Sequence, residues 1–176
     1  MIETMKESGE VLYATNNVVS ILGSDLLELR KLAELNPRRR IRLCCHRGVD
    51  DVIHEMVIYH PRGTYVQPHM HEDKDESFHL ILGQADIVFF NQHGKVIEVL
   101  PMGAHGSGKA FYYRIPPRVY HTQIFREDTF FHEVTRGPFN AESTIKAKWA
   151  PVETEVATVV TYMNEILKTV TSLGVD

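Results

Sequence analysis

The chain has 176 residues, of which 43% are hydrophobic, and this size suits one compact domain with its own core. It contains 19 Lys and Arg residues against 23 Asp and Glu residues, so the formal net charge of −4 provides no basic field for nucleic acid or an anionic membrane surface. We therefore expect a small-molecule or protein partner, and neither nucleic acid nor a membrane.

The cellular location is predicted from two features. No apolar segment approaches the roughly 20 residues that cross a bilayer, and the first ten residues, MIETMKESGE, lack the charged-then-apolar order of a signal peptide. The two cysteines, Cys44 and Cys45, are adjacent and would point to opposite faces of a strand, which disfavours an ordinary disulfide. Both features predict a cytoplasmic protein in a reducing compartment.

The N-terminal part of the chain changes from strand-like to helical periodicity. The stretch VLYATNNVVSIL, residues 11–22, has alternating and β-branched character, and SDLLELRKLAELNP, residues 24–37, repeats leucine at helical spacing. We expect a helix here with Ser24 as its N-cap, ended by Asn36 and Pro37.

From residue 38 onward, short strand-like runs alternate with Gly, Pro, Asn and Asp, which is typical of an antiparallel sandwich or barrel rather than of βαβ units. Within this part, FFNQHGKV predicts a hairpin whose turn contains Asn91 and Gly94. Strands are expected at residues 39–45, 54–60, 63–67, 76–82, 85–91, 95–100, 110–115, 119–125 and 129–135.

The last part of the chain returns to helical periodicity. The stretch ETEVATVVTYMNEILKTVTSLG predicts an amphipathic helix that ends at Gly174 and buries its apolar stripe on the barrel or on a second subunit. The stripe consists of Val156, Val159, Val160, Met163, Ile166, Leu167 and Val170.

Candidate metal ligands gather in QPHMHEDKDESFHLILG, residues 67–83. His69 and His71 are two apart, so on an extended chain both side chains leave the same face. Glu76 opens the next strand, and His121 stands at the mouth of a later strand after a proline turn. Three imidazoles and one carboxylate suit a divalent transition metal. A lone His-x-His pair, by contrast, is more often a surface feature of a charged loop.

The wider spacing favours the metal site. Gly63, five residues, His69-x-His71, four residues, Glu76, six residues and Gly83 follow the order of the first motif of the cupins, which this stretch resembles.

A second cupin motif is matched further along the chain. Pro116 and His121 stand where that motif places its proline and histidine, while Arg118 occupies its glycine position and Phe125 the position of an asparagine found in many cupins. A small β-barrel suits such a site, because inward-facing positions at its mouth can converge on one metal.

Further stretches, including NPRRRIRLCCH, RGPFN and WAP, resemble the WbuC family of cupin fold metalloproteins over about residues 30–151. The resemblance implies a mainly β fold, a cupin barrel (double-stranded β-helix, jelly-roll-like) with an N-terminal helix and a C-terminal helix. It divides the chain into an extension at 1–37, the barrel at 38–151 and the helix at 152–176. Members of this family are often encoded in bacterial O-antigen and other surface-polysaccharide gene clusters.

The same resemblance implies a bacterial, cytoplasmic protein that binds one divalent transition metal, Fe, Mn, Ni or Zn. The ligands would be His69, His71, Glu76 and His121, and Glu76 is also the candidate catalytic residue. The resemblance supplies no substrate.

Four residues are candidates for binding a substrate. Arg40 and Arg42 share one face of an extended RRRIRLCCH and could clamp a phosphate or carboxylate, the alternative being a solvated or ion-paired run. Gln67 and Gln123 lie two residues from ligand histidines and could position a substrate or a bound water. For Gln67, a cross-strand hydrogen bond is an equal alternative.

We predict a metalloenzyme that acts on a small polar molecule, with isomerase or epimerase chemistry favoured. The family resemblance, rather than any residue of this chain, implies a sugar or nucleotide-sugar of surface-polysaccharide (O-antigen) biosynthesis as the substrate. Fe(II)-dependent dioxygenase chemistry is the first alternative. The second is a non-catalytic metal- or ligand-binding module, because four protein ligands can close a zinc site completely. The C-terminal stripe and the open sheet edges also predict a homodimer.

Overall fold

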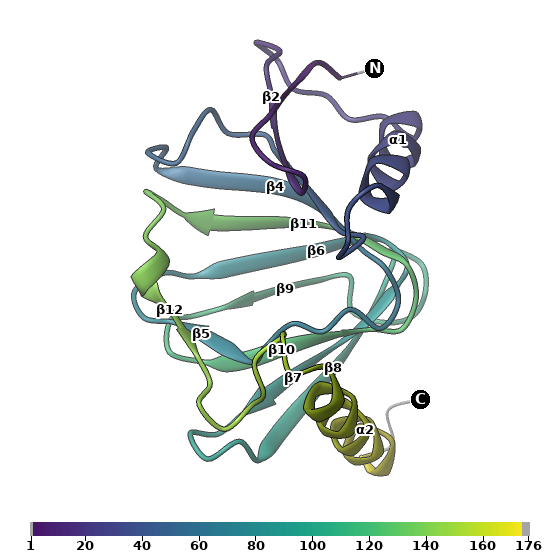
Figure 1. Ribbon diagram of the computed structural model, residues 1–176, viewed down its shortest axis with the longest axis vertical. Helices are drawn as coiled ribbons and strands as arrows, with labels where there is room; N and C mark the ends of the chain where they lie inside the picture. Colours follow the sequence, from purple (N-terminus) through teal and green to yellow (C-terminus); the bar gives the residue numbers. More distant parts are fainter. Residues whose placement is uncertain (1, 174–176) are drawn as a thin grey trace.

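The computed structural model describes residues 2–173 and contains two facing β-sheets flanked by one helix on each outer side (Figure 1). Within these residues no helix is long and apolar enough to cross a membrane. In chain order the elements are β1 (Thr4–Lys6), β2 (Val11–Ala14), α1 (Gly23–Glu34), β3 (Ile41–Cys44), β4 (Ile53–His60), β5 (His69–His71), β6 (Glu76–Leu82), β7 (Gln84–Phe90), β8 (Val96–Gly103), β9 (Tyr112–Ile115), β10 (Tyr120–Phe125), β11 (Thr129–Arg136), a 3-10 turn (Ala141–Ser143), β12 (Thr144–Lys146) and α2 (Val156–Ser172).

The two sheets mix strands from distant parts of the sequence. The seven-stranded sheet has the order β1-β2-β3-β4-β11-β6-β9, and the five-stranded sheet has the order β12-β5-β10-β7-β8. All pairings between two described strands are antiparallel except that of β2 with β3. Because β5 and β6 follow one another in sequence yet belong to opposite sheets, the first cupin-like motif spans the space between the sheets. The expected mainly β, jelly-roll-like fold with a helix near each end is confirmed.

The core between the sheets is apolar over most of its length. Large side chains such as Phe78, Leu80, Ile87 and Phe125 are almost fully buried there. Their inward positions follow the period of two along each strand, so polar residues at the same parity also point inward. This parity places the ligand candidates of β5, β6 and β10 inside the sandwich.

Helix α1 covers the outer face of the seven-stranded sheet. Leu29 and Ala33 are buried against β3 and β4. The predicted N-cap at Ser24 is wrong, because Leu22 is the N-cap and Ser24 lies inside the helix. The Asp25 carboxylate accepts the backbone N–H of Leu22 at 2.8 Å and that of Ile2 at 3.2 Å, so an acidic residue in the first turn replaces the expected serine cap.

Helix α2 packs on the outer face of the five-stranded sheet at the opposite side of the molecule (Figure 1). Ile166 and Val170 are its buried residues, whereas Val156 and Val160 of the predicted stripe are exposed. The sheet therefore covers only the C-terminal half of the stripe. The expected end of the helix at Gly174 lies outside the described residues.

The predicted strands agree with the observed ones with one exception. Residues 63–67 form no strand, and the pairing segment instead begins at His69, directly before the metal-ligand candidates. The sequence reading also missed β1 and β12, which are short, polar edge strands. The β7–β8 hairpin is confirmed: Gly94 has a φ of 81°, and the Asn91 side chain accepts the backbone N–H groups of His93 and Lys95.

Candidate metal centre

Three adjacent strands of the five-stranded sheet bring the histidines together. On β5, His69 pairs with His121 of β10 on one side and with Lys146 of β12 on the other, while His71 pairs with Thr144 of β12. Because β5 is extended, its two histidines share the inward face. The proximity of His121 is therefore a consequence of strand register.

The fourth candidate reaches the histidines from the facing sheet. Oε2 of Glu76 lies 3.0 Å from Nε2 of His71, and Oε1 lies 3.5 Å from Nε2 of His121. One ligand atom from each of four residues lies within 4.8 Å of all the others. We call these four residues, His69, His71, Glu76 and His121, the metal-ligand group.

The remaining ring nitrogens are held by partners outside the metal-ligand group. Nδ1 of His69 is 3.0 Å from the Gln67 carbonyl, and Nδ1 of His121 is 3.0 Å from the Val119 carbonyl. A carbonyl only accepts, so these Nδ1 atoms carry the proton and leave the Nε2 lone pairs free. Nδ1 of His71 lies 3.1 Å from the Thr144 hydroxyl. This orientation suits coordination of a cation through three Nε2 atoms.

His121 supports the same interpretation. Its side chain is fully buried, and its Nε2 atom has no hydrogen-bond partner within the described residues. A buried nitrogen without a partner is costly, and a metal ion would satisfy it. The residues present therefore fit a divalent transition metal.

The ionisation of the metal-ligand group is set by burial and by the close carboxylate. Burial lowers the pKa of His69 to about 3, so that ring is neutral. Burial alone would raise the pKa of Glu76, but the nearby charge of His121 and the hydrogen bond of His71 outweigh it and hold that pKa well below the usual range. For His121, burial acts downward, but the Glu76 carboxylate raises the pKa overall. Because a metal cation would compete with a proton for Nε2 of His121, metal binding should weaken as pH falls.

The turn before His121 keeps its geometry without the glycine of the second cupin motif. Arg118 occupies that position with a φ of 65°, in the left-handed region that favours glycine. Its backbone N–H donates to the His71 carbonyl at 2.7 Å, and its guanidinium pairs with Glu72 at 2.6 Å. These two contacts hold the turn against β5. Phe125, which occupies the position of the asparagine found in many cupins, is buried in the core.

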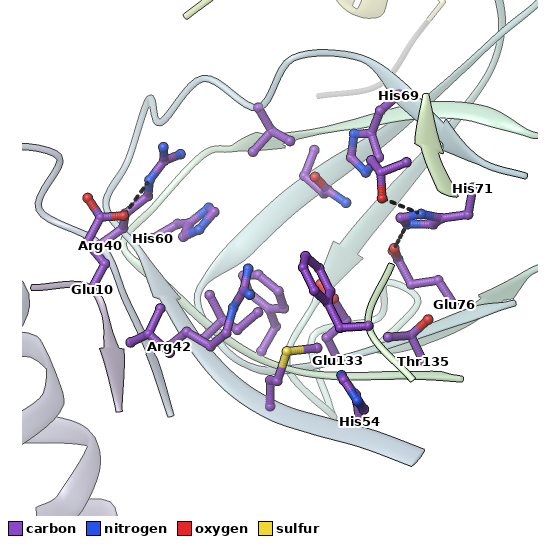
Figure 2. A pocket seen from close by; sticks show the side chains of 18 of the residues that line it. Glu10, Arg40, Arg42, His54, His60, His69, His71, Glu76, Glu133 and Thr135 are labelled. Atoms are coloured by element: carbon purple, nitrogen blue, oxygen red, sulfur yellow. Dashed lines mark hydrogen bonds and ion pairs between the residues drawn. The ribbon is translucent and has the colours of Figure 1, made fainter. Parts of the chain in front are cut away.

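A cavity of about 480 Å³ opens from the metal-ligand group toward the edge of the sandwich formed by β2, β3 and β12. Figure 2 shows His69, His71 and Glu76 at one side of this cavity and Glu10, Arg40 and His60 at the other. Because His121 is fully buried behind the cavity wall, a bound molecule would meet the metal-ligand group from the side of the other three residues.

The four predicted substrate-binding residues differ in position. Gln123, Arg40 and Arg42 all line the cavity. Gln67 does not, because its side-chain amide donates to the carbonyls of Ala147 at 3.3 Å and Ala150 at 3.4 Å. The Gln67 amide therefore contacts the backbone of the segment that follows β12 rather than the cavity.

Sequence reasoning did not place two further side chains at this site, Tyr113 and Glu133. The Tyr113 hydroxyl donates to Oε1 of Glu76 at 3.0 Å from the neighbouring strand β9. Glu133 lies on β11 in the inward row that also contains Thr135 and lines the cavity. Strand parity alone would have found Glu133, whereas Tyr113 required the register of β9.

Comparison with known proteins agrees with the fold. A model of a domain of unknown function, DUF6016, matches residues 21–102. The search of curated proteins gave no match. Among solved structures, a protein from Shewanella oneidensis matches with a TM-score of 0.52 and 14% identity, covering 68% of this chain and 82% of the other.

Two further structures are more distant. KdgF from a Halomonas species matches at 15% identity with a TM-score of 0.46, covering 61% of this chain and 87% of its own. Oxalate decarboxylase from Bacillus subtilis matches at 19% identity with a TM-score of 0.44 over 56% of this chain, and the match spans only 24% of the decarboxylase. The chain therefore has a cupin-like fold that contains a buried group of three histidines and one glutamate able to hold a metal ion.

Proposed function

We propose that this protein is a metal-dependent enzyme whose metal is held by His69, His71, Glu76 and His121. One observation carries the proposal. One ring nitrogen from each of three histidines and one carboxylate oxygen converge within 4.8 Å of one another, and they do so at the wall of a cavity large enough for a small polar molecule. A purely structural site would have no need of that cavity.

The mixed nitrogen and oxygen donors suit Fe, Mn, Ni or Zn. When bound, such an ion supplies Lewis-acid polarisation of a carbonyl or hydroxyl oxygen, or an activated water. Glu76 would bind through a carboxylate that the Tyr113 hydroxyl orients. Gln123, two residues beyond His121 on β10, would orient a substrate through its amide.

Glu133 supports isomerase or epimerase chemistry, which requires a proton to be moved within the site. It lines the cavity and forms no ion pair or side-chain hydrogen bond within residues 2–173. Burial, and next the Glu76 charge, raise the pKa of Glu133 to about 7. A carboxyl group with that pKa can both accept and donate a proton near neutral pH. Dioxygenase chemistry on Fe(II) is the alternative reaction at the same four ligands.

The narrower assignment rests on the resemblance of the sequence to the WbuC family. On that basis we propose a location in the bacterial cytoplasm and a sugar or nucleotide-sugar of surface-polysaccharide synthesis as the substrate. The proposal of a homodimer rests instead on the C-terminal helical stripe and the open sheet edges. The non-catalytic alternative is a closed four-ligand zinc site. The short distances within the metal-ligand group favour this alternative.

Hydrogen exchange tests the proposed reaction. The metal-loaded protein is incubated in D₂O with a panel of phosphosugars and nucleotide-sugars, and carbon-bound deuterium and new isomers are followed by NMR. We expect exchange with one class, reduced at least about 100-fold in Glu133→Gln and unchanged in Glu98→Gln on the exposed face of β8. Glu76→Gln with metal retained should also lose turnover. Exchange by none of the panel, in protein shown to hold metal, contradicts the isomerase proposal.

A further inference from the structure

The cavity has a second polar region on the side opposite the metal-ligand group. The lining of the whole cavity contains five Lys and Arg residues but only three Glu residues, namely Arg38, Arg40, Arg42, Lys74 and Lys146 against Glu10, Glu76 and Glu133. Because Glu76 belongs to the metal-ligand group, whose bound cation would offset it, the remainder of the cavity carries a clear excess of positive charge. Such a cavity favours an anionic molecule.

The arginines of this region differ in whether their charge is already matched. Arg40 pairs with Glu153 at 2.7 Å and lies 3.6 Å from Glu10, while Arg38 pairs with both of these carboxylates. Arg42, by contrast, forms no ion pair within residues 2–173, although it lines the same cavity. The first two arginines therefore brace the cavity edge, and Arg42 is left with its hydrogen-bond donors available.

The strand register explains why Arg42 points into the cavity. On β3, Ile41 and Leu43 are buried under helix α1, so Arg42 between them faces the space between the sheets. Figure 2 shows its guanidinium in the same space as Glu133, with the metal-ligand group across the cavity. A bound molecule could thus contact Arg42 and the metal-ligand group at once.

His60 provides an independent sign that this region is built for a ligand. It lines the cavity beside Arg40, its Nδ1 atom is buried, and that atom has no hydrogen-bond partner within the described residues. Its ring packs on Phe125, with ring centroids 4.8 Å apart, which fixes its orientation. An unsatisfied buried ring nitrogen is costly, and a ligand or a water held with it would remove that cost.

Lys146 completes the region from the other sheet. It lies on edge strand β12 opposite His69 and forms no ion pair within residues 2–173. Its side chain lines the same cavity as Arg42 and His60, so its charge is available to a molecule bound there.

We propose that Arg42, together with Lys146 and His60, forms a subsite for an oxyanion of the substrate, a phosphate or a carboxylate. This inference rests on the proposed function in one respect: the remainder of the substrate is taken to reach the metal-ligand group. It narrows the substrate class from small polar molecules to small acids, such as phosphorylated or carboxylated sugars. The guanidinium of Arg42 would bind the oxyanion through two parallel N–H donors.

Calorimetric titration of the metal-loaded protein with inorganic phosphate and, separately, with malonate tests the subsite. We expect saturable binding of at least one of the two, and the tighter of them identifies the preferred oxyanion. Arg42→Gln and Lys146→Gln should each weaken that binding about tenfold or more. Arg62→Gln is the matched control, because Arg62 is an exposed arginine outside the cavity. Metal content is measured on every sample, which separates this test from that of the metal site.

The same titration on protein stripped with a chelator distinguishes the subsite from binding of the anion to the metal. Retention of binding, with continued dependence on Arg42, supports the subsite. Loss of binding on stripping, equal binding by wild type and both cavity variants, or no saturable binding of either anion to the wild type would each overturn it.

Discussion

Nε2 of His71 lies 3.0 Å from Oε2 of Glu76, and these two side chains belong to opposite sheets of the sandwich. The contact exists only when the sheets are closed on one another. Since the unfolded chain has no preformed site, metal binding at these residues is coupled to folding.

We therefore predict that metal stabilises the protein against unfolding. A free metal concentration of 100 times Kd should add about 2.7 kcal/mol to the free energy of unfolding. Thermal unfolding with and without chelator measures this effect. His71→Ala should show no such shift, and an equal shift in that variant would place the metal elsewhere.

Tyr113 is predicted to tune metal affinity through Glu76. Tyr113→Phe removes the hydroxyl that donates to Oε1 at 3.0 Å but keeps the ring stacked on Phe78. We expect metal binding to weaken about tenfold or more while the fold is retained. The adjacent Tyr112→Phe is the control, because Tyr112 is exposed and its hydroxyl donates to Ser77 rather than to the metal-ligand group. Equal affinities in the two variants would show that this hydrogen bond does not orient the ligand.

The free energy of unfolding of the chelator-treated protein should decrease as the pH is lowered, and His60 should account for part of this decrease. Burial, and next the positive charge of Arg40, lower the pKa of His60 to about 3. Below pH about 6.5 the unfolded side chain binds a proton that the folded one does not, so stability decreases as pH falls from 6.5 toward 3, by on the order of 1 kcal/mol per pH unit.

Urea unfolding of chelator-treated protein at pH 7 and pH 5 checks this slope. His60→Leu should reduce the difference between the two pH values, whereas His93→Leu, on the exposed hairpin turn, should leave it unchanged. An unaltered difference in His60→Leu would mean that other groups account for the acid sensitivity.

The left-handed backbone conformation of Arg118 is predicted to limit which residues this position tolerates. Its φ of 65° is costly for a β-branched residue, so Arg118→Val should destabilise by about 1–3 kcal/mol. Arg118→Gly relieves the strain and loses only an exposed ion pair with Glu72, so its stability should stay within about 1 kcal/mol of the wild type. Arg114→Val, at an exposed position of strand β9, controls for loss of charge. Urea denaturation distinguishes the three variants.

Much of the fold was predictable because strand parity and turn residues are local. The β7–β8 hairpin follows from Asn91 and Gly94, and the inward faces of His69 and His71 follow from their spacing of two. The cap of α1 was not predictable in this way, because Asp25 accepts from Ile2, a residue 23 positions away. The contact with Ile2 favours a helix that begins after Leu22 over one capped by Ser24.

The site was predictable to the extent that motif spacing specifies it. The metal-ligand group converges as the spacing predicted, but its surroundings depend on register between distant strands. Thr144 meets His71 through a strand of three residues with no strong sequence signal, and Gln67 is taken up by the carbonyls of Ala147 and Ala150. No local pattern carries that information.

Metal content of the protein purified without a metal-affinity step, measured by mass spectrometry for wild type and His71→Ala, tests the central claim most directly. The account predicts near-stoichiometric Fe, Mn, Ni or Zn in the wild type and its loss in the variant, because His71 supplies one of the four ligands. Metal-free wild type that cannot be reloaded with any of these ions would contradict the metal centre and leave a barrel that binds its ligand without one.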